Sequence, residues 1–330
     1  MSIRNFLIIG FILTSLSVSA QFPPPAGVSG TTAIPRDSAC FKSWATGCTV
    51  TRGFVNISDT TITYLGNNRA YYGDDTDGLG QPDDSVVSLG DGGTATLTFS
   101  VVIGNGSGPD FAVFENGLSD TFLELAFVEV SSNGTRFVRF PAISNTPTTS
   151  QISTFGSVDA TLINNFAGKY RRLFGTPFDL EDIKDSSDIN VNHITHVRLV
   201  DAIGCIQPEF ASFDSRDSIV NEPWPTPFHS CGFDLDAVGV INISAESVGN
   251  ISGSPAFMVY PNPVSDYVSV SGDQPEFILT VNSMSGQPVI DRLTVTHTTK
   301  IRMADLPAGL YLFQAVFQDG RILTQKVLKK

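Results

Sequence analysis

The stretch FVEVSSNGTRFVRF, residues 127–140, decides the fold class. Hydrophobic and polar residues alternate in both halves of this stretch, and Asn133-Gly134 lies between them. Alternation with a period of two is typical of a half-buried strand, and Asn-Gly between two such runs is typical of a hairpin turn. The sequence therefore predicts an antiparallel hairpin at this place.

Runs of the same kind lie on both sides of the hairpin and are separated by Gly-rich turns. Strands are predicted at residues 94–103, 110–115, 122–131, 136–140, 196–201 and 236–243. Helical periodicity is almost absent, apart from a one- or two-turn candidate at residues 158–166. Short strands at this spacing predict an all-β fold, a jelly roll or β-sandwich, for residues 56–243. Residues 21–55 are rich in Pro, Gly and Thr and are predicted to be irregular.

The composition limits the class of protein. The chain has 330 residues, of which 41% are hydrophobic and 16% charged, so it can bury a core and is long enough for two domains. Its net charge of −13 argues against a nucleic-acid partner, because phosphate binding requires a basic surface.

The N-terminus has the pattern of a secretory signal peptide, residues 1–20. Arg4 precedes an apolar run at residues 6–18, and Val18-Ser19-Ala20 is a small-x-small cleavage site. A transmembrane anchor is the alternative, but about 20 apolar residues are needed to span a bilayer. No other stretch is long and apolar enough, so no transmembrane segment is expected after signal removal.

Four cysteines fit an exported protein, since disulfides persist in oxidising compartments. Two bridges have three possible connectivities, and proximity in the sequence favours Cys40–Cys48 and Cys205–Cys231. A zinc site is the alternative, but the chain has no C-x-x-C pair.

Residues 257–330 form a separate C-terminal segment. Their short alternating strands predict a small Ig-like β-sandwich. Residues 252–330 carry seven basic and six acidic side chains, whereas residues 21–251 carry twelve and twenty-seven. Residues 244–256 are rich in Ser, Gly and Asn and are predicted to be a flexible linker.

The C-terminal segment resembles the type A C-terminal sorting domain of the type IX secretion system of Bacteroidetes. The resemblance rests on the opening Tyr260-Pro261-Asn262-Pro263, on the strand that contains Gly309 and Tyr311, and on the basic last strand. It implies a type IX translocon as partner, removal of the domain by a sortase-like surface peptidase, and a secreted or outer-membrane-anchored cell-surface location.

Residues 60–243 resemble a family of secreted bacterial cell-surface proteins. The resemblance rests on SLGDGG at residues 88–93, GPDFAVFENG at 108–117, ELAFVEVS at 124–131 and GFDLDAVGVIN at 232–242. The hairpin and the last of these stretches are also similar to discoidin-like and carbohydrate-binding jelly rolls. That similarity implies a structural calcium ion and loops at one end that bind a ligand.

Carboxylates at several places are candidates for a calcium site, because calcium prefers six to eight oxygen ligands. Closely spaced acids followed by Gly78 resemble the start of a calcium loop, although Ser85 stands where an EF-hand has Glu. The candidate ligands are Asp74, Asp75, Asp77, Asp110, Glu115, Asn116, Asp234 and Asp236.

Aromatic loop residues are candidates for sugar binding, since the apolar faces of sugar rings stack on aromatic rings. The candidates are Tyr71, Tyr72 and Trp224, and three prolines stiffen the loop around Trp224. A lid packed over the end of the sandwich is the alternative for Trp224.

The sequence thus predicts a calcium-stabilised binding or adhesion protein with a glycan as first ligand, and not an enzyme. A polysaccharide-active enzyme is the alternative and would need a pair of facing carboxylates, for which Glu115, Glu124 and Glu129 are candidates. A surface-layer component without a ligand is a further alternative.

Overall fold

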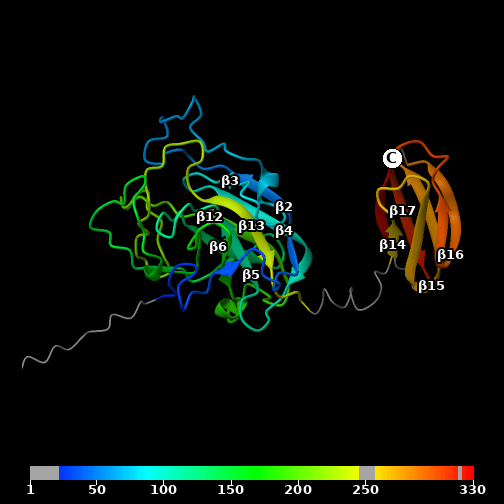
Figure 1. Ribbon diagram of the computed structural model, residues 1–330, viewed down its shortest axis with the longest axis horizontal. Helices are drawn as coiled ribbons and strands as arrows, with labels where there is room; N and C mark the ends of the chain where they lie inside the picture. The colour runs from blue at the N-terminus through cyan, green and yellow to red at the C-terminus, as the bar shows by residue number, and fades with distance from the viewer. Residues whose placement is uncertain (1–21, 245–256, 285, 319–321) are drawn as a thin grey trace, which may run out of the picture. The chain divides into compact units, whose positions relative to one another are not determined.

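The computed structural model describes residues 22–244, 257–284, 286–318 and 322–330. The predicted signal peptide and all but the first residue of the predicted linker lie outside the described residues. The chain divides into two compact units, with the boundary between Ile243 and Ser244 (Figure 1). Strands account for 42% of the structure and helix for 4%, which confirms the all-β fold class.

The first unit contains thirteen of the strands described here and three short 3₁₀ helices. Its strands are β1 (Ile34–Pro35), β2 (Ser43–Thr51), β3 (Val87–Ser88), β4 (Thr94–Ile103), β5 (Phe111–Glu115), β6 (Ala126–Ser131), β7 (Val138–Arg139), β8 (Ile143–Ser144), β9 (Ile163–Asn164), β10 (Phe166–Ala167), β11 (Phe174–Phe178), β12 (Ile194–Asp201) and β13 (Asp234–Val240). The 3₁₀ helices are η1 (Asp75–Gly78), η2 (Ala160–Leu162) and η3 (Leu180–Ile183). The helical candidate at residues 158–166 is therefore one turn, η2, followed by strand.

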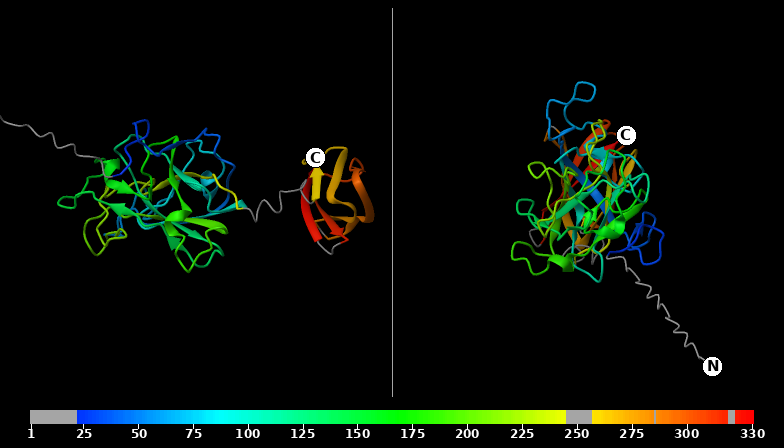
Figure 2. Two further views of the ribbon diagram at one scale, coloured as in Figure 1. Left: turned by 90° about the horizontal axis from the view of Figure 1, so that it is seen from below. Right: turned by 90° about the vertical axis from the view of Figure 1, so that its left-hand side faces the viewer.

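Two antiparallel layers make up the first unit (Figure 2). One layer has the strand order β1-β11-β5-β13, and the other has the order β4-β12-β6-β10. β2 joins them: its first two residues pair with β13, and from Ala45 onward it pairs with β4. A register shift between Ala45 and Gly47 marks the place where β2 turns from one layer to the other, as β-bulges do at sheet corners.

The prediction that residues 21–55 are irregular is wrong, because β1 and β2 lie within them. β2 occupies a central position in the strand order rather than an edge. Only Cys48 and Val50 alternate with the exposed Thr49 and Thr51, which is too short a pattern to stand out from the Pro- and Gly-rich residues before it.

The main hydrophobic core lies between the two layers. β5 and β13 contribute Phe111 and Val238 from one side, and β6 and β12 contribute Val128 and Leu199 from the other. Burial of this apolar surface is the main source of stability of such a sandwich.

β5 is buried on both faces. Phe111 points into the main core, whereas Phe114 belongs to a second cluster on the outer face of the layer. The N-terminal segment covers that face, with the rings of Phe41 and Trp44 centred 5.6 and 5.8 Å from the ring of Phe114. The N-terminal segment therefore completes the burial of β5.

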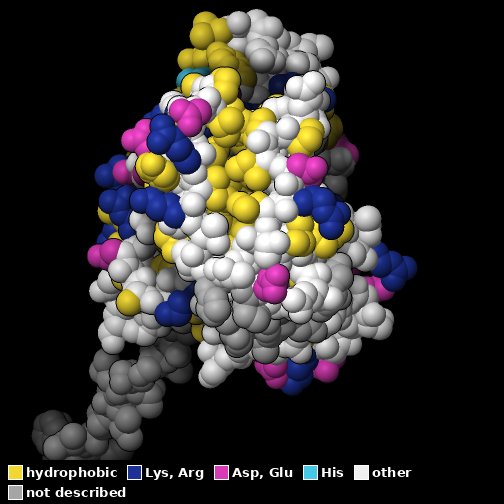
Figure 3. Space-filling model, turned by 90° about the vertical axis from the view of Figure 1, so that its right-hand side faces the viewer, with side chains coloured by type: hydrophobic (Ala, Val, Ile, Leu, Met, Phe, Trp, Pro, Cys, Tyr) yellow, Lys and Arg dark blue, Asp and Glu magenta, His cyan; other side chains and the backbone are white. Residues whose placement is uncertain are grey.

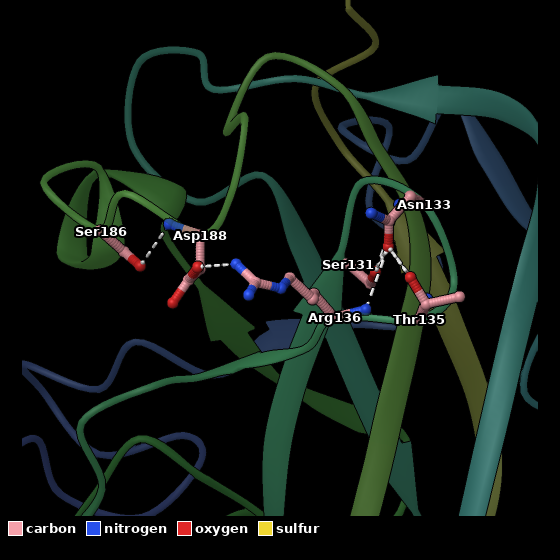
Figure 4. Close-up of polar contacts among 6 residues, drawn as sticks. All are labelled: Ser131, Asn133, Thr135, Arg136, Ser186 and Asp188. Carbon is pink, nitrogen blue, oxygen red and sulfur yellow. Dashed lines mark hydrogen bonds and ion pairs between the residues drawn. The ribbon is translucent and has the colours of Figure 1, made fainter.

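The predicted hairpin is present as β6 and β7, in which Glu129 pairs with Arg139 and Val130 with Val138. Its turn is held by Asn133, whose Oδ1 accepts hydrogen bonds from the backbone N–H groups of Thr135 and Arg136 at 2.9 and 3.0 Å (Figure 4). The Arg136 guanidinium forms an ion pair with Asp188 (Figure 4).

Glu129 is held by two arginines. Its carboxylate accepts hydrogen bonds from Arg139 Nε at 2.9 Å and from Arg198 Nε at 2.6 Å. Arg139 belongs to β7 and Arg198 to β12, the two strands that pair with β6 next to Glu129. Glu129 is therefore a structural ion-pair residue and not half of a catalytic carboxylate pair.

The second unit is a five-stranded antiparallel sheet closed around its own core. Its strands are β14 (Phe257–Tyr260), β15 (Tyr267–Ser283), β16 (Pro288–Arg302), β17 (Gly309–Phe317) and β18 (Ile322–Lys329). The order is β14-β15-β17-β18, with β16 paired to β15. Phe277, Leu279 and Phe313 are among the side chains that fill the core.

The Tyr260-Pro261-Asn262-Pro263 stretch fixes the last strand in place. Asn262 Nδ2 donates to the carbonyl oxygen of Lys326 at 2.8 Å, and the Leu328 N–H donates to Asn262 Oδ1 at 2.9 Å. Val264 continues this contact by hydrogen bonds with the backbone of Leu328 and Lys330. The opening of the domain is thus bonded to its end.

Replacing Asn262 tests this contact. We expect Asn262→Ala to lower the unfolding free energy of the second unit by about 1–2 kcal/mol, because two hydrogen bonds are lost. Asn262→Asp keeps the acceptor for Leu328 but loses the donor to Lys326, so it should have a smaller effect. Amide hydrogen exchange of β18 in the full chain measures the loss of stability in both variants. Equal exchange in all three proteins would contradict a role for Asn262.

Tyr311 and the outward row of β17 and β18 complete the second unit. Tyr311 OH donates to the Pro307 carbonyl oxygen at 2.9 Å, which anchors the turn before β17. Val316, Ile322 and Leu328 are 38%, 59% and 44% exposed. Figure 3 shows hydrophobic side chains gathered in a stripe that Lys and Arg side chains flank.

The four cysteines are free thiols in the structure, so the predicted disulfides Cys40–Cys48 and Cys205–Cys231 are not formed. Cys40 Sγ instead accepts a hydrogen bond from Ser38 at 3.2 Å, and Cys231 Sγ donates to the Phe54 carbonyl oxygen at 3.6 Å.

Candidate functional site: an acidic pocket with an aromatic wall

Three buried carboxylates meet where strands of both layers begin or end. Glu115 is the last residue of β5, and in the antiparallel pair it lies opposite Leu235 of β13. Asp234, the first residue of β13, is therefore its neighbour. Glu124 lies two residues before β6 of the other layer.

The oxygens of Glu115, Glu124 and Asp234 lie within 4.8 Å of one another. These side chains are 1%, 7% and 6% exposed. Glu115 Oε2 accepts a hydrogen bond from the Gly117 N–H at 2.6 Å, and Asp234 Oδ1 accepts one from the Ser88 hydroxyl. Glu124 accepts none within the described part of the chain.

Burial is the main reason that the pKa values of these three groups are raised. The pKa values of Glu115 and Glu124 lie well above their usual range, through burial and then through the charge of Asp234. Burial raises the pKa of Asp234 to about 7, against the opposing effects of Ser88, Asn116 and, more weakly, Arg52.

A second group of buried acids lies beside the first. Asp91 accepts hydrogen bonds from the Ile57 N–H at 2.8 Å and from the Trp224 indole N–H at 3.1 Å. Asp201 accepts from the N–H groups of Gly92 and Phe233, and Glu222 from that of Leu125. Burial raises the pKa of Asp91 to about 6 and, with the Asp91 charge, that of Asp201 to about 8.

Glu124 and Asp234 line a cavity of about 330 Å³. Aromatic side chains form much of its wall: Tyr72, Phe122, Phe155, Phe228 and His229. They come from loops far apart in the sequence, and their rings contact each other. The Phe155 and Phe228 rings are stacked with centroids 5.9 Å apart, and the Tyr72 and His229 rings meet edge to face at 5.3 Å.

Some of the predicted calcium ligands are brought together and others are not. Asn116 and Asp234 line the pocket and are hydrogen-bonded to each other, and Glu115 belongs to the carboxylate cluster with Asp234. Asp236 is close enough that its charge also raises the pKa of Glu115. Its own carboxylate accepts hydrogen bonds from the N–H groups of Asp83 and Asp84.

Asp110 has a structural role. Its carboxylate accepts hydrogen bonds from the N–H groups of Leu180 and Gly106, both at 2.7 Å, and from Asn242 Nδ2 at 3.0 Å. These bonds tie the loop before β5 to the segments that follow β11 and β13. Its oxygens are therefore already occupied.

The predicted calcium loop forms η1. Asp77 accepts a hydrogen bond from the Asp74 N–H at 2.8 Å, and Asp75 accepts one from the Val50 N–H at 3.3 Å. Among the residues that the structure describes, these three acids do not bring one oxygen each within 4.8 Å of the others. Their oxygens serve the backbone of the turn and of β2.

Only some of the aromatic residues predicted to bind a ligand are exposed. Tyr71 and Tyr72 are 39% and 45% exposed, and Tyr72 lines the pocket. Trp224 is only 7% exposed and is bonded to Asp91, so it is not an exposed stacking surface for sugars. Trp224 is therefore packed inside the protein, which agrees with the alternative interpretation of this residue.

Glu124 was not among the predicted metal ligands, and Phe155 and Phe228 were not among the predicted ligand-binding residues. Glu124 stands in a hydrophobic run, Phe122 to Val130, and an acid within such a run is the signal that was available. Phe155 is 76% exposed, which the sequence alone does not indicate.

The fold defines a β-sandwich unit followed by a small β-domain. Residues 258–330 match the family described as the secretion system C-terminal sorting domain. This domain directs the protein to the type IX secretion machinery, and the protein is secreted or located at the cell surface. Comparison with the curated proteins gave no match. Within the described ranges, no helix has the length and hydrophobicity required to cross a bilayer.

Proposed function

We propose that the first unit is a saccharide-binding module that type IX secretion delivers to the cell surface or the medium. The observation that carries the proposal is the pocket: aromatic rings form its wall and carboxylates its floor. Sugar rings present apolar C–H faces to aromatic side chains and hydroxyl groups to carboxylates. A volume of about 330 Å³ is at the lower end for small-ligand sites, which fits one or two sugar rings.

The proposal includes the fate of the second unit. A sortase-like surface peptidase removes the sorting domain after transport, which leaves the first unit attached to the surface or released. The pocket lies within the first unit, so removal of the second leaves its lining residues intact.

Binding of mono- and oligosaccharides to the purified full chain tests the function. We expect Tyr72→Ala and Phe228→Ala each to weaken binding about three- to tenfold, since one stacked ring contributes about 0.5–1.5 kcal/mol. Phe213→Ala is the matched control, because Phe213 is 43% exposed and is not part of the pocket lining. Calorimetric titration measures the affinities. An equal loss in the control, or no saccharide bound by the unaltered chain, would refute the proposal.

A polysaccharide-active enzyme is the second candidate, and the three carboxylates favour it. Retaining glycosidases carry two carboxyl groups about 5 Å apart, one of them protonated, and Glu124 with its raised pKa fits the acid. Release of reducing ends from polysaccharides by the unaltered chain, and its loss in Glu124→Gln, would favour this function over binding.

A further inference from the structure

The carboxylates of Glu115, Glu124 and Asp234, two of which line the pocket, are arranged as ligands of a cation. Their oxygens lie within 4.8 Å of one another although they come from β5, β13 and the segment before β6. Calcium holds oxygen ligands at about 2.3–2.6 Å, so two ligands on opposite sides of the ion are about 4.6–5.2 Å apart. The spacing of the cluster therefore matches one shared ion.

Glu124 provides an independent indication. Its side chain is 93% buried, since only 7% of its surface is exposed, and it lines the cavity. No hydrogen-bond donor contacts its carboxylate within the described residues, whereas Glu115 and Asp234 each have at least one. A buried carboxylate without a donor is costly, so this side chain is positioned for a ligand.

The charged groups around the cluster also favour a bound cation. Arg52 is the basic group whose charge acts on Asp234, and its guanidinium donates to the carbonyl oxygens of Tyr72, Ser88 and Gly73. Asp91, Asp201 and Glu222 add further negative groups nearby. Buried acids at this density need a counter-charge or protons.

We propose that Glu115, Glu124 and Asp234 bind a divalent, oxygen-preferring cation, with calcium the best fit. The donor set contains carboxylate oxygens and neither sulfur nor imidazole, which favours calcium over zinc or copper. Three carboxylates provide three to six of the ligands that calcium requires, and water or a bound molecule in the pocket provides the others.

The position of the ion also gives it a role in ligand binding. Because Glu124 and Asp234 line the cavity, the open coordination positions face the pocket, where two hydroxyl groups of a sugar would complete them. This step rests on the proposed saccharide function. The cation site itself does not.

Calcium binding by the full chain, stripped of metal with a chelator, is the test. We expect calcium to bind, to raise the midpoint of thermal unfolding by several degrees, and to lose affinity at least about tenfold in Glu124→Gln and in Asp234→Asn. Asp74→Asn is the matched control: it removes an exposed acid from the predicted calcium loop and should leave the affinity unchanged.

Thermal unfolding of Glu124→Gln in chelator shows whether a loss of calcium affinity comes from loss of the folded state. Because Glu124 has no hydrogen bond to lose and the substitution replaces a buried acid with a neutral amide, the variant should unfold at the same or a higher temperature than the unaltered chain in chelator. Absence of calcium binding by the unaltered chain, or its loss in Asp74→Asn but not in Glu124→Gln, would overturn the proposal. Calcium binding without any saccharide binding would overturn the proposed function and leave the cation site standing.

Discussion

Without metal ions, the first unit should lose roughly 5 kcal/mol of unfolding free energy between pH 5 and pH 8. Asp91 and Asp201 carry this effect, with pKa values of about 6 and about 8 in the folded chain and about 3.9 in an unfolded one. A carboxyl whose pKa is higher in the folded state holds its proton more tightly there. Its contribution is complete below about pH 4 and is lost as the pH rises through the folded-state pKa.

The acidic groups around Asp91 and Asp201 also lower the stability as the pH rises. Glu124, Glu222 and Asp234 repel Asp201 or are repelled by it, and the pKa values of all three are raised. Burial lowers the pKa of Lys169 to about 8, so deprotonation of this group increases the unfolding free energy above pH 8. The predicted loss of stability is therefore limited to the range from pH 5 to pH 8. Most proteins gain stability over this range or keep it, so the direction is diagnostic.

Urea unfolding in chelator at several pH values measures the effect. Asp201→Asn should flatten the dependence by more than half, because it removes the group with the larger change. Asp214→Asn is the control: the pKa of Asp214 is lowered by three backbone N–H groups and by Arg216, so its contribution changes only at more acidic pH. A stability that rises from pH 5 to pH 8 in chelator would show that these acids are ionised in the folded chain.

Phe111→Ala should destabilise the first unit by about 3–5 kcal/mol, the usual effect of emptying a phenylalanine site in a core. Phe111 is fully buried between the layers, where its ring stacks on that of Phe178 at 5.4 Å and meets that of Phe140 at 5.8 Å. Both strand β5 and strand β11 lose packing when the ring is removed.

Tryptophan fluorescence reports this change specifically, because Trp44 and Trp224 both belong to the first unit. Phe213→Ala, at a half-exposed position, should shift the same urea transition by less than about 0.5 kcal/mol. Similar shifts in the two variants would mean that Phe111 is not a central core residue.

The strands could be predicted because their pattern is local. β4, β6 and β12 alternate or are rich in β-branched residues over six to ten positions, and the turn at Asn133 is read directly from Asn-Gly. β2 was missed because its partners, Trp44 with Gly239 and Cys48 with Leu97, are distant in the sequence. Its burial comes from those partners and not from its own periodicity.

The acidic site was only half predictable for the same reason. The sequence included Glu115 and Asp234 among its candidate calcium ligands. Glu124 joins them because β6 belongs to the opposite layer and its preceding residues reach the same place, which no spacing reveals. The acidic run at residues 74–77 looked like a ligand loop, but its oxygens bond to neighbouring N–H groups in the folded chain.

The position of β13 governs when the first unit can fold during synthesis and export. β13 is the last strand of the unit, yet it lies between β5 and β2, and β2 links it to β4. Until residues 234–240 are available, the layer that contains β1, β11 and β5 cannot join β2, and contacts that span almost two hundred residues form slowly. A chain synthesised from its N-terminus therefore cannot complete the first unit until its last strand is available.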